Sequence, residues 1–325
     1  MKQILTTSFL VFCFVNLLSA QALTWNPEEP KAGEKITVTY NPAGTPLAKE
    51  KNIEAVAYFF GVPSGMKEIP LKKTGNVYTG SFVTDTGTVL STIVFSAGEI
   101  KDINRNSGYM VSVRDKQGKI RQGTYSAYAD QYDGFGNYLY GLPANAEWAF
   151  NYRKQEWNEF PSNRSNITPM YMQALYTKKK KEAEPEILQL MADMEAAGNL
   201  TENQYNTLSG WYQRLGQKDK STALKAEMKD KYPTGNWKKV ESQNAFYSEA
   251  DPSKKEEVLI AHLKAYPPVT DNDKLQENYY YSSLATSFAQ PKDETKRDIE
   301  KFKVYAAKLP IEMKASLYNN VSWNL

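Results

Sequence analysis

The hydrophobic pattern of this 325-residue chain changes its period once, near residue 140, and no other feature restricts the fold as strongly. Before that point apolar and polar residues alternate, which places the apolar side chains on one face of a half-buried strand. About seven short strands at hairpin spacing are typical of an immunoglobulin-like sandwich, so we predict an all-β domain over residues 23–140. The alternating runs are residues 36–40, 55–60, 77–83, 89–96, 109–113 and 120–125.

From Pro143 onward the period becomes about 3.6 residues, which predicts helices. The sequence Lys231-Tyr232-Pro233 recurs as Ala265-Tyr266-Pro267, 34 residues later, and each copy closes a pair of predicted helices. A third and longer pair ends at Pro310. We therefore predict an all-α, TPR-like helical repeat domain over residues 141–325, with an irregular helical bundle as the alternative.

Local capping patterns support these helices. Thr201 and Gln204 have the spacing of a capping box at the start of the first pair. Asp251 directly before Pro252 is typical of an N-cap followed by a first-turn proline. The chain stops at Leu325 within a helical pattern and without a stop signal, so we expect the helical domain to be truncated at its C-terminus.

Residues 1–22 have the pattern of a cleavable signal peptide. A short apolar run follows Lys2, and Ala20-Gln21-Ala22 provides a cleavage site between small residues. Cleavage removes Cys13, the only cysteine, so the mature chain can form no internal disulfide. We therefore expect an exported protein in the periplasm of a Gram-negative cell, with no transmembrane segment.

Charge and composition exclude several classes of function. Forty Lys and Arg against 37 Asp and Glu leave a net charge of +3, too close to balance for a general nucleic-acid binder. One histidine and one cysteine are too few for a metal cage, a Cys–His nucleophile or a Ser-His-Asp triad. We assign no catalytic, cofactor-binding or metal-binding residue, and no cofactor.

Two acidic segments are candidates for metal sites. Asp102, Asn104, Asn106 and Gly108 resemble half of a calcium loop, but an EF-hand requires glycine and glutamate where this chain has Ser107 and Val113. An Asx-rich hairpin connection is the favoured interpretation. A second group, formed by Asp130, Asp133 and Gly134, is a weaker candidate.

Aromatic residues gather where the period changes. Such rings can line a sugar or peptide groove, but more often they pack domains together, and we favour packing. The stretch comprises Tyr125, Tyr128, Tyr132, Phe135, Tyr138 and Tyr140, and a second run is Tyr279-Tyr280-Tyr281. We interpret the basic run of residues 178–181 as solvated, and His262 as a packed residue of a repeat helix.

Several short motifs together resemble the amino-terminal portion of large periplasmic thioredoxin-like proteins of the TlpA type. The matching residues are Asp102, Asn106 and Gly108-Tyr109, then residues 115–119 and 123–126, Lys231-Tyr232-Pro233 and residues 317–320. The resemblance implies an immunoglobulin-like domain and helical repeats that precede a thioredoxin domain. The catalytic Cys-x-x-C pair of that family maps onto no residue of this chain.

These observations lead to hypotheses of different classes. The first is an exported, non-enzymatic scaffold that binds a protein or peptide. The second is the accessory amino-terminal half of a thiol-disulfide oxidoreductase whose thioredoxin domain lies beyond residue 325. Carbohydrate binding by the sandwich is a third and more distant hypothesis.

Overall fold

A computed structural model describes residues 22–322 and divides the chain into two compact units, Met1–Ala196 and Ala197–Leu325. The predicted signal peptide lies outside the described residues apart from Ala22, and so do Cys13 and the end of the chain at Leu325. Within the described residues, no helix combines the length and the apolar character needed to cross a membrane.

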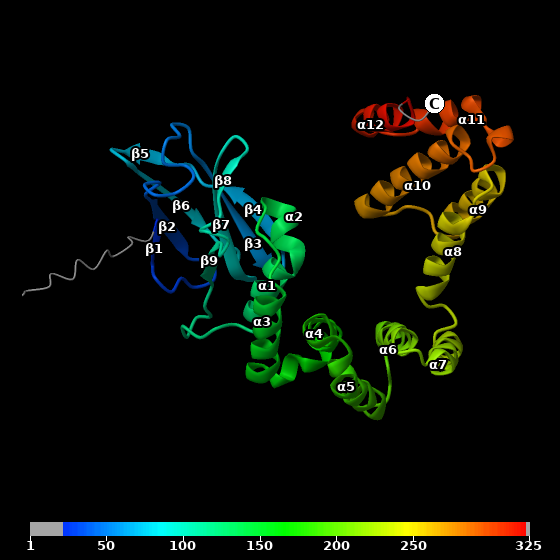
Figure 1. Ribbon diagram of the computed structural model, residues 1–325, viewed down its shortest axis with the longest axis horizontal. Coiled ribbons are helices and arrows are strands. Elements are labelled where there is room, and N and C mark those ends of the chain that lie inside the picture. The colour runs from blue at the N-terminus through cyan, green and yellow to red at the C-terminus, as the bar shows by residue number, and fades with distance from the viewer. Residues whose placement is uncertain (1–21, 323–325) are drawn as a thin grey trace, which may run out of the picture. The chain divides into compact units, whose positions relative to one another are not determined.

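The first unit begins with two antiparallel sheets (Figure 1). One sheet has the strand order β1-β2-β6-β5, and the other has the order β4-β3-β7-β8 with β9 also paired to β7. The strands are β1 (Leu23–Asn26), β2 (Lys35–Tyr40), β3 (Glu54–Gly61), β4 (Gly65–Glu68), β5 (Lys72–Thr74), β6 (Val77–Val83), β7 (Thr88–Ala97), β8 (Ile100–Asp102) and β9 (Tyr109–Ser112). The prediction of an N-terminal β region is confirmed.

The sheets share one core, as in a sandwich. Tyr40 of one sheet stacks on Phe95 of the other with ring centroids 3.8 Å apart, and Ile36 and Ile93 belong to the same buried cluster. The alternating strands were predictable because each buries one face. Strands β4 and β5 are fully exposed and only four and three residues long, so they carry no alternating pattern.

The prediction of a strand over residues 120–125 is wrong. Helix α1 (Thr124–Asp130) begins inside this run, directly after Gly123, whose φ of 92° ends extended structure. The buried residues Thr124, Ala127 and Ala129 follow a helical spacing. Six residues of alternation are too few to outweigh the tertiary contacts that this helix makes.

Helices cover the outer face of the five-stranded sheet. Residues 88–95 of β7 are buried at every position, because one face lies in the sandwich core and the other lies under the following helices. The remaining elements of this unit are η1 (Gln131–Phe135), α2 (Gly136–Tyr140), α3 (Ala146–Glu159), η2 (Pro161–Asn163), α4 (Arg164–Lys179), η3 (Lys180–Ala183) and α5 (Glu184–Ala196).

The described part of the second unit is helical. Its elements are α6 (Glu202–Arg214), α7 (Lys218–Lys231), α8 (Trp237–Ser248), α9 (Pro252–Ala265), α10 (Asp271–Ala289), η4 (Glu294–Lys296), α11 (Ile299–Ala307) and α12 (Ile311–Ser322). Helices α6 and α7 pack together, as do α8 and α9, and α10 and α11. The capping box of Thr201 with Gln204 and the N-cap of Asp251 are both confirmed.

Candidate functional site

The aromatic stretch forms the best candidate site, on helices that lie against the sheet. A kinked π-helical segment, η1, follows α1, and the kink falls at Gly134, whose φ is 110°. Residues other than glycine rarely adopt this backbone conformation. Single π-helical turns are frequent at functional sites, because they change the direction in which side chains point.

Two tyrosines of this stretch fasten the helices to the sheet. Tyr132 and Tyr140 are both buried. The Tyr132 hydroxyl donates to the Ser107 carbonyl at 2.7 Å, and the Tyr140 hydroxyl donates to Gln131 Oε1 at 2.5 Å. Both rings belong to one buried cluster with Val94 of β7, so the packing interpretation describes these residues, which join helix and sheet within one unit.

Two other rings of the stretch face solvent beyond the kink. Phe135 is 48% exposed and Tyr138 is 83% exposed, and their rings stack with centroids 6.5 Å apart. Phe135 also contacts the edge of Phe60, with centroids 6.2 Å apart. Neighbouring Val62 is 86% exposed. Single exposed apolar side chains are ordinary, but a contiguous group of them marks a binding surface.

A groove of about 640 Å³ lies beside these rings, and we call it the aromatic groove. Its apolar lining includes Phe60, Val62, Val89, Ala127 and Phe135. The loop at its rim packs backbone against backbone, since a Cβ on Gly61 would lie 2.1 Å from the Gly87 carbonyl oxygen. Any larger residue at position 61 would therefore displace this loop.

The charged residues of the groove are held in place. Arg121 donates from Nη1 to the carbonyls of Thr86 at 3.0 Å and Thr88 at 2.7 Å, and Asp130 pairs with the buried Arg153. A groove with fixed polar groups and apolar walls is typical of small-ligand or side-chain binding.

A second cavity, of about 450 Å³, lies on the other side of the same helices. Tyr128 and Tyr152 stack there with ring centroids 4.7 Å apart, and Trp148 contacts Tyr132 edge to face at 4.9 Å. Ser107 of the β8–β9 connection also lines this cavity. The aromatic stretch therefore borders a cavity on each side.

Burial of these tyrosines predicts a loss of stability in alkali. Burial raises the pKa of Tyr140 to about 12, and burial also raises the pKa of Tyr132 and Tyr128. Because the unfolded tyrosines ionise near pH 10, their contribution is complete below pH 10 and is lost as the pH rises toward 12. We expect the urea midpoint of the first unit to fall over this interval.

The measurement is urea unfolding by circular dichroism at several pH values, with tyrosinate absorbance recorded in parallel. A Tyr138→Phe variant is the control, because this exposed side chain should leave the profile unchanged. An unchanged urea midpoint between pH 10 and 12 would contradict the prediction.

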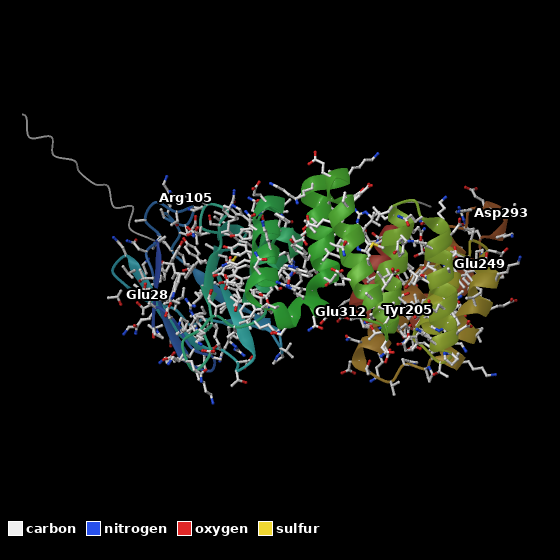
Figure 2. All side chains as sticks on the ribbon, turned by 90° about the horizontal axis from the view of Figure 1, so that it is seen from below. Glu28, Arg105, Tyr205, Glu249, Asp293 and Glu312 are labelled. Carbon is white, nitrogen blue, oxygen red and sulfur yellow. The ribbon has the colours of Figure 1, made fainter. Side chains whose placement is uncertain are left out.

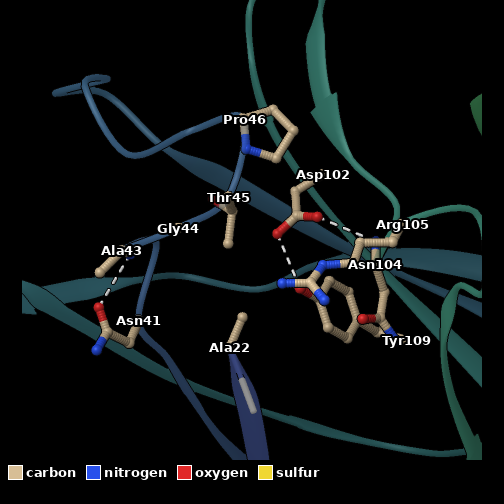
Figure 3. Close-up of a pocket in the computed structure, with 10 residues that line it drawn as sticks. All are labelled: Ala22, Asn41, Ala43, Gly44, Thr45, Pro46, Asp102, Asn104, Arg105 and Tyr109. Carbon is tan, nitrogen blue, oxygen red and sulfur yellow. Dashed lines mark hydrogen bonds between the residues drawn. The ribbon is translucent and has the colours of Figure 1, made fainter. Parts of the chain in front are cut away.

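The calcium-like sequence forms the connection between β8 and β9 (Figure 3). The Asp102 carboxylate is 2% exposed and accepts hydrogen bonds from the hydroxyls of Tyr40 at 2.7 Å and Tyr109 at 2.8 Å. Its other oxygen accepts from the Asn104 backbone N–H at 3.0 Å. Asn104, Arg105 and Asn106 all have left-handed φ angles, between 51° and 69°. Asp102 therefore acts as a buried acceptor within an Asx-rich turn.

Asp130, Asp133 and Gly134, the second acidic group, do not form a common site. Asp130 pairs with Arg153, Gly134 forms the kink of η1, and burial raises the pKa of Asp133. Among residues 22–322, no cluster of three or more His, Cys, Asp or Glu side chains is arranged to hold a metal ion.

The basic run at residues 178–181 is partly paired. Lys178 forms an ion pair with Glu147, and Lys179 forms one with Glu186 at 3.0 Å. Both lysines remain partly exposed, so each pair contributes little stability.

His262 and Tyr280 are packed residues of the second unit. His262 is 2% exposed, and its Nδ1 is hydrogen-bonded to Ser242 Oγ at 2.9 Å. Burial, with a smaller contribution from Lys239, lowers the pKa of His262 and favours the neutral ring. Tyr280 lies against it edge to face at 5.2 Å, whereas Tyr279 is 51% exposed.

Comparison of the chain with protein-family models, with curated proteins and with solved structures finds no significant match.

Proposed function

We propose that this protein is a non-enzymatic scaffold that binds a peptide or protein partner through the aromatic groove. The observation that carries the proposal is the exposed Phe135–Tyr138 stack beside that groove. Exposed aromatic rings next to an apolar pocket are the usual anchors of protein interfaces, because each buries a large area at little cost in conformational entropy.

The rim of the groove favours an apolar partner segment. The Asp130 carboxylate is paired with Arg153, and the Arg121 guanidinium is fixed by hydrogen bonds to the Thr86 and Thr88 carbonyls. The apolar part of the contact surface comprises Phe60, Val62, Val89, Ala127 and Phe135. We propose that an aliphatic or aromatic side chain of the partner enters the groove.

The proposal includes the finer fold assignments and the cellular location. The two antiparallel sheets with a shared core support an immunoglobulin-like sandwich. The packed helix pairs, with Pro233 and Pro267 directly after their last turns, support a TPR-like repeat. The pattern of residues 1–22 supports export to the periplasm.

The TlpA-type resemblance supports a second candidate, the accessory half of a thiol-disulfide oxidoreductase. Its hairpin motif includes Asp102 and Tyr109, which share a buried hydrogen bond in this chain. Reading the gene beyond codon 325 tests it. A continuing frame that encodes Cys-x-x-Cys would support it, and a stop codon would remove it.

The groove is tested by selecting peptides from a random library against the purified chain and measuring their affinity for variants. We expect Phe135→Ala combined with Tyr138→Ser to weaken binding about tenfold or more, since truncated anchors typically cost at least 1.4 kcal/mol. Both side chains are substantially exposed, so we expect stability to change by only about 0.5 kcal/mol.

The matched control is Tyr279→Ser, which removes from the second unit an aromatic ring about as exposed as that of Phe135. It should leave the affinity unchanged. Selected peptides that bind the double variant as tightly as the original chain would refute the assignment of the groove.

A further inference from the structure

Lys255, in the first turn of α9, is a buried lysine without a carboxylate partner. Its side chain belongs to a residue that is only 8% exposed, and its ammonium lies 4.8 Å from the centre of the Phe246 ring. Among residues 22–322, no carboxylate is within ion-pair distance of this ammonium, whereas buried Arg153 pairs with Asp130. Lysines are almost never buried to this extent unless they are paired.

The residue lines a small pocket of about 220 Å³ within the second unit, which we call the lysine pocket. The walls come from the end of α8, the start of α9 and the end of α10. Besides Lys255, the charged residues in this lining are Glu249, labelled in Figure 2, and the exposed Lys292. One carboxylate against two ammonium groups leaves a single positive charge in the lining.

Apart from the exposed Lys292, the other polar side chains of the pocket already have partners. The Ser248 hydroxyl donates to the Ala245 carbonyl at 3.3 Å, and the Ser287 hydroxyl donates to the Leu284 carbonyl at 2.7 Å. Glu249 accepts from the Asp251 backbone N–H at 2.8 Å. Lys255 is thus the largely buried residue of the pocket whose ammonium still lacks an anionic acceptor.

The pKa shift of Lys255 is consistent with an ammonium that has no carboxylate partner. Burial lowers the pKa of Lys255, and the nearby Glu249 only partly opposes this effect. An anion that entered the pocket would stabilise the charged ammonium directly. A charge-assisted hydrogen bond in such a partly desolvated site is stronger than one at the surface.

We propose that the lysine pocket binds a carboxylate group carried on a peptide-like stem, with Lys255 as its buried counter-charge. A carboxylate neutralises the single net positive charge of the lining, whereas the doubly charged form of phosphate would leave a net negative charge beside Glu249. The volume suits a side chain or a chain end rather than a whole small molecule. This site is independent of the aromatic groove, since it lies entirely within the second unit.

The test is a titration of the full chain with two carboxylate probes, in which two-dimensional ¹H–¹⁵N NMR spectra are recorded at each probe concentration. The probes are N-acetylglycine, which presents a terminal carboxylate, and N-acetylglutamic acid α-amide, which presents a side-chain carboxylate. We expect saturable shifts for amides of residues 247–255 and 287–292, with a millimolar dissociation constant. The tighter of the two probes identifies the natural source of the carboxylate.

Variants then assign the counter-charge. We expect Lys255→Met, which keeps the apolar stem over Phe246, to weaken binding about tenfold or more. Lys264→Met is the matched control, because it removes an exposed lysine from the same helix and should leave binding unchanged. Lys292→Ser removes the exposed second charge without disturbing the core, and we expect it to weaken binding severalfold.

Three results would overturn the proposal. One is the absence of saturable shifts with either carboxylate. Another is unchanged binding in Lys255→Met, whatever the effect of Lys292→Ser. The third is binding of inorganic phosphate, at matched ionic strength, more tightly than either carboxylate.

Discussion

Replacing Glu156 with alanine is expected to destabilise the first unit by about 3 kcal/mol or more, because a buried carboxylate with several donors would be lost. Glu156 is fully buried on α3. Its oxygens accept from the backbone N–H groups of Gly123 at 2.7 Å, Tyr125 at 3.2 Å and Ser126 at 3.3 Å, and from Asn163 Nδ2 at 3.0 Å.

These donors explain the size of the effect. The first N–H groups of any helix lack partners within the helix, and no side chain at Gly123 caps α1. Glu156 therefore supplies the cap from another helix, and its removal leaves the first amides of a seven-residue helix unsatisfied in a partly buried place. The negative charge also lies favourably at the positive end of the α1 dipole.

Urea unfolding of the full chain, followed by circular dichroism, measures the loss. Glu156→Gln should lower the free energy of unfolding by about half as much, because it keeps one acceptor oxygen but turns its amide NH₂ group toward the donors. Glu182→Ala is the charge-matched control, since it removes an exposed carboxylate of the same unit and should cost about 0.5 kcal/mol or less. A loss below about 1 kcal/mol for Glu156→Ala would show that water replaces the carboxylate as the cap.

The contact between Glu156 and the start of α1 shows why part of the fold was predictable from the sequence and part was not. Strands such as β2 and β6 bury one face, so their alternation is visible in the sequence. Strand β7 is buried on both faces, and residues 120–125 alternate by coincidence before a helix. The cap of α1 lies about thirty residues away along the chain, where no local pattern marks it.

The candidate sites show a similar division. The aromatic stretch was visible as a cluster of rings, but its separation into buried Tyr140 and exposed Tyr138 depends on which side of α2 lies against the rest of the unit. Phe60 reaches Phe135 only through the tertiary fold. The burial of Lys255 could not be predicted from the sequence, because a lysine in the first turn of an amphipathic helix is ordinarily solvated. Only its burial distinguishes this residue.

Asp102 provides the second large expected effect, because its carboxylate joins the two sheets of the sandwich. Tyr40 comes from β2 of one sheet, while Asp102 and Tyr109 come from β8 and β9 of the other. Burial, followed by the hydrogen bond to Asp102, raises the pKa of both tyrosines, so their hydroxyls remain neutral donors at ordinary pH. Substitution of Asp102 by alanine leaves both hydroxyls without their acceptor.

We expect Asp102→Ala to cost about 3 kcal/mol, since each of two hydrogen bonds to a buried charge typically contributes about 1.5 kcal/mol or more. Asp102→Asn keeps the shape but not the charge, and should cost about half as much. Urea unfolding measures both values. Asp85→Ala, which removes an exposed carboxylate of the same unit, should change stability by about 0.5 kcal/mol or less.

A double-mutant cycle separates this bridge from simple loss of packing. We expect Tyr40→Phe and Asp102→Asn to be coupled by about 1 kcal/mol, because each removes the same hydrogen bond between the sheets. Tyr78→Phe is the control for the cycle, since its hydroxyl donates instead to the Lys51 carbonyl at 3.1 Å and should be additive with Asp102→Asn. Additivity of Tyr40→Phe with Asp102→Asn would mean that the stacking of Tyr40 on Phe95, and not the carboxylate, holds the sheets together at this point.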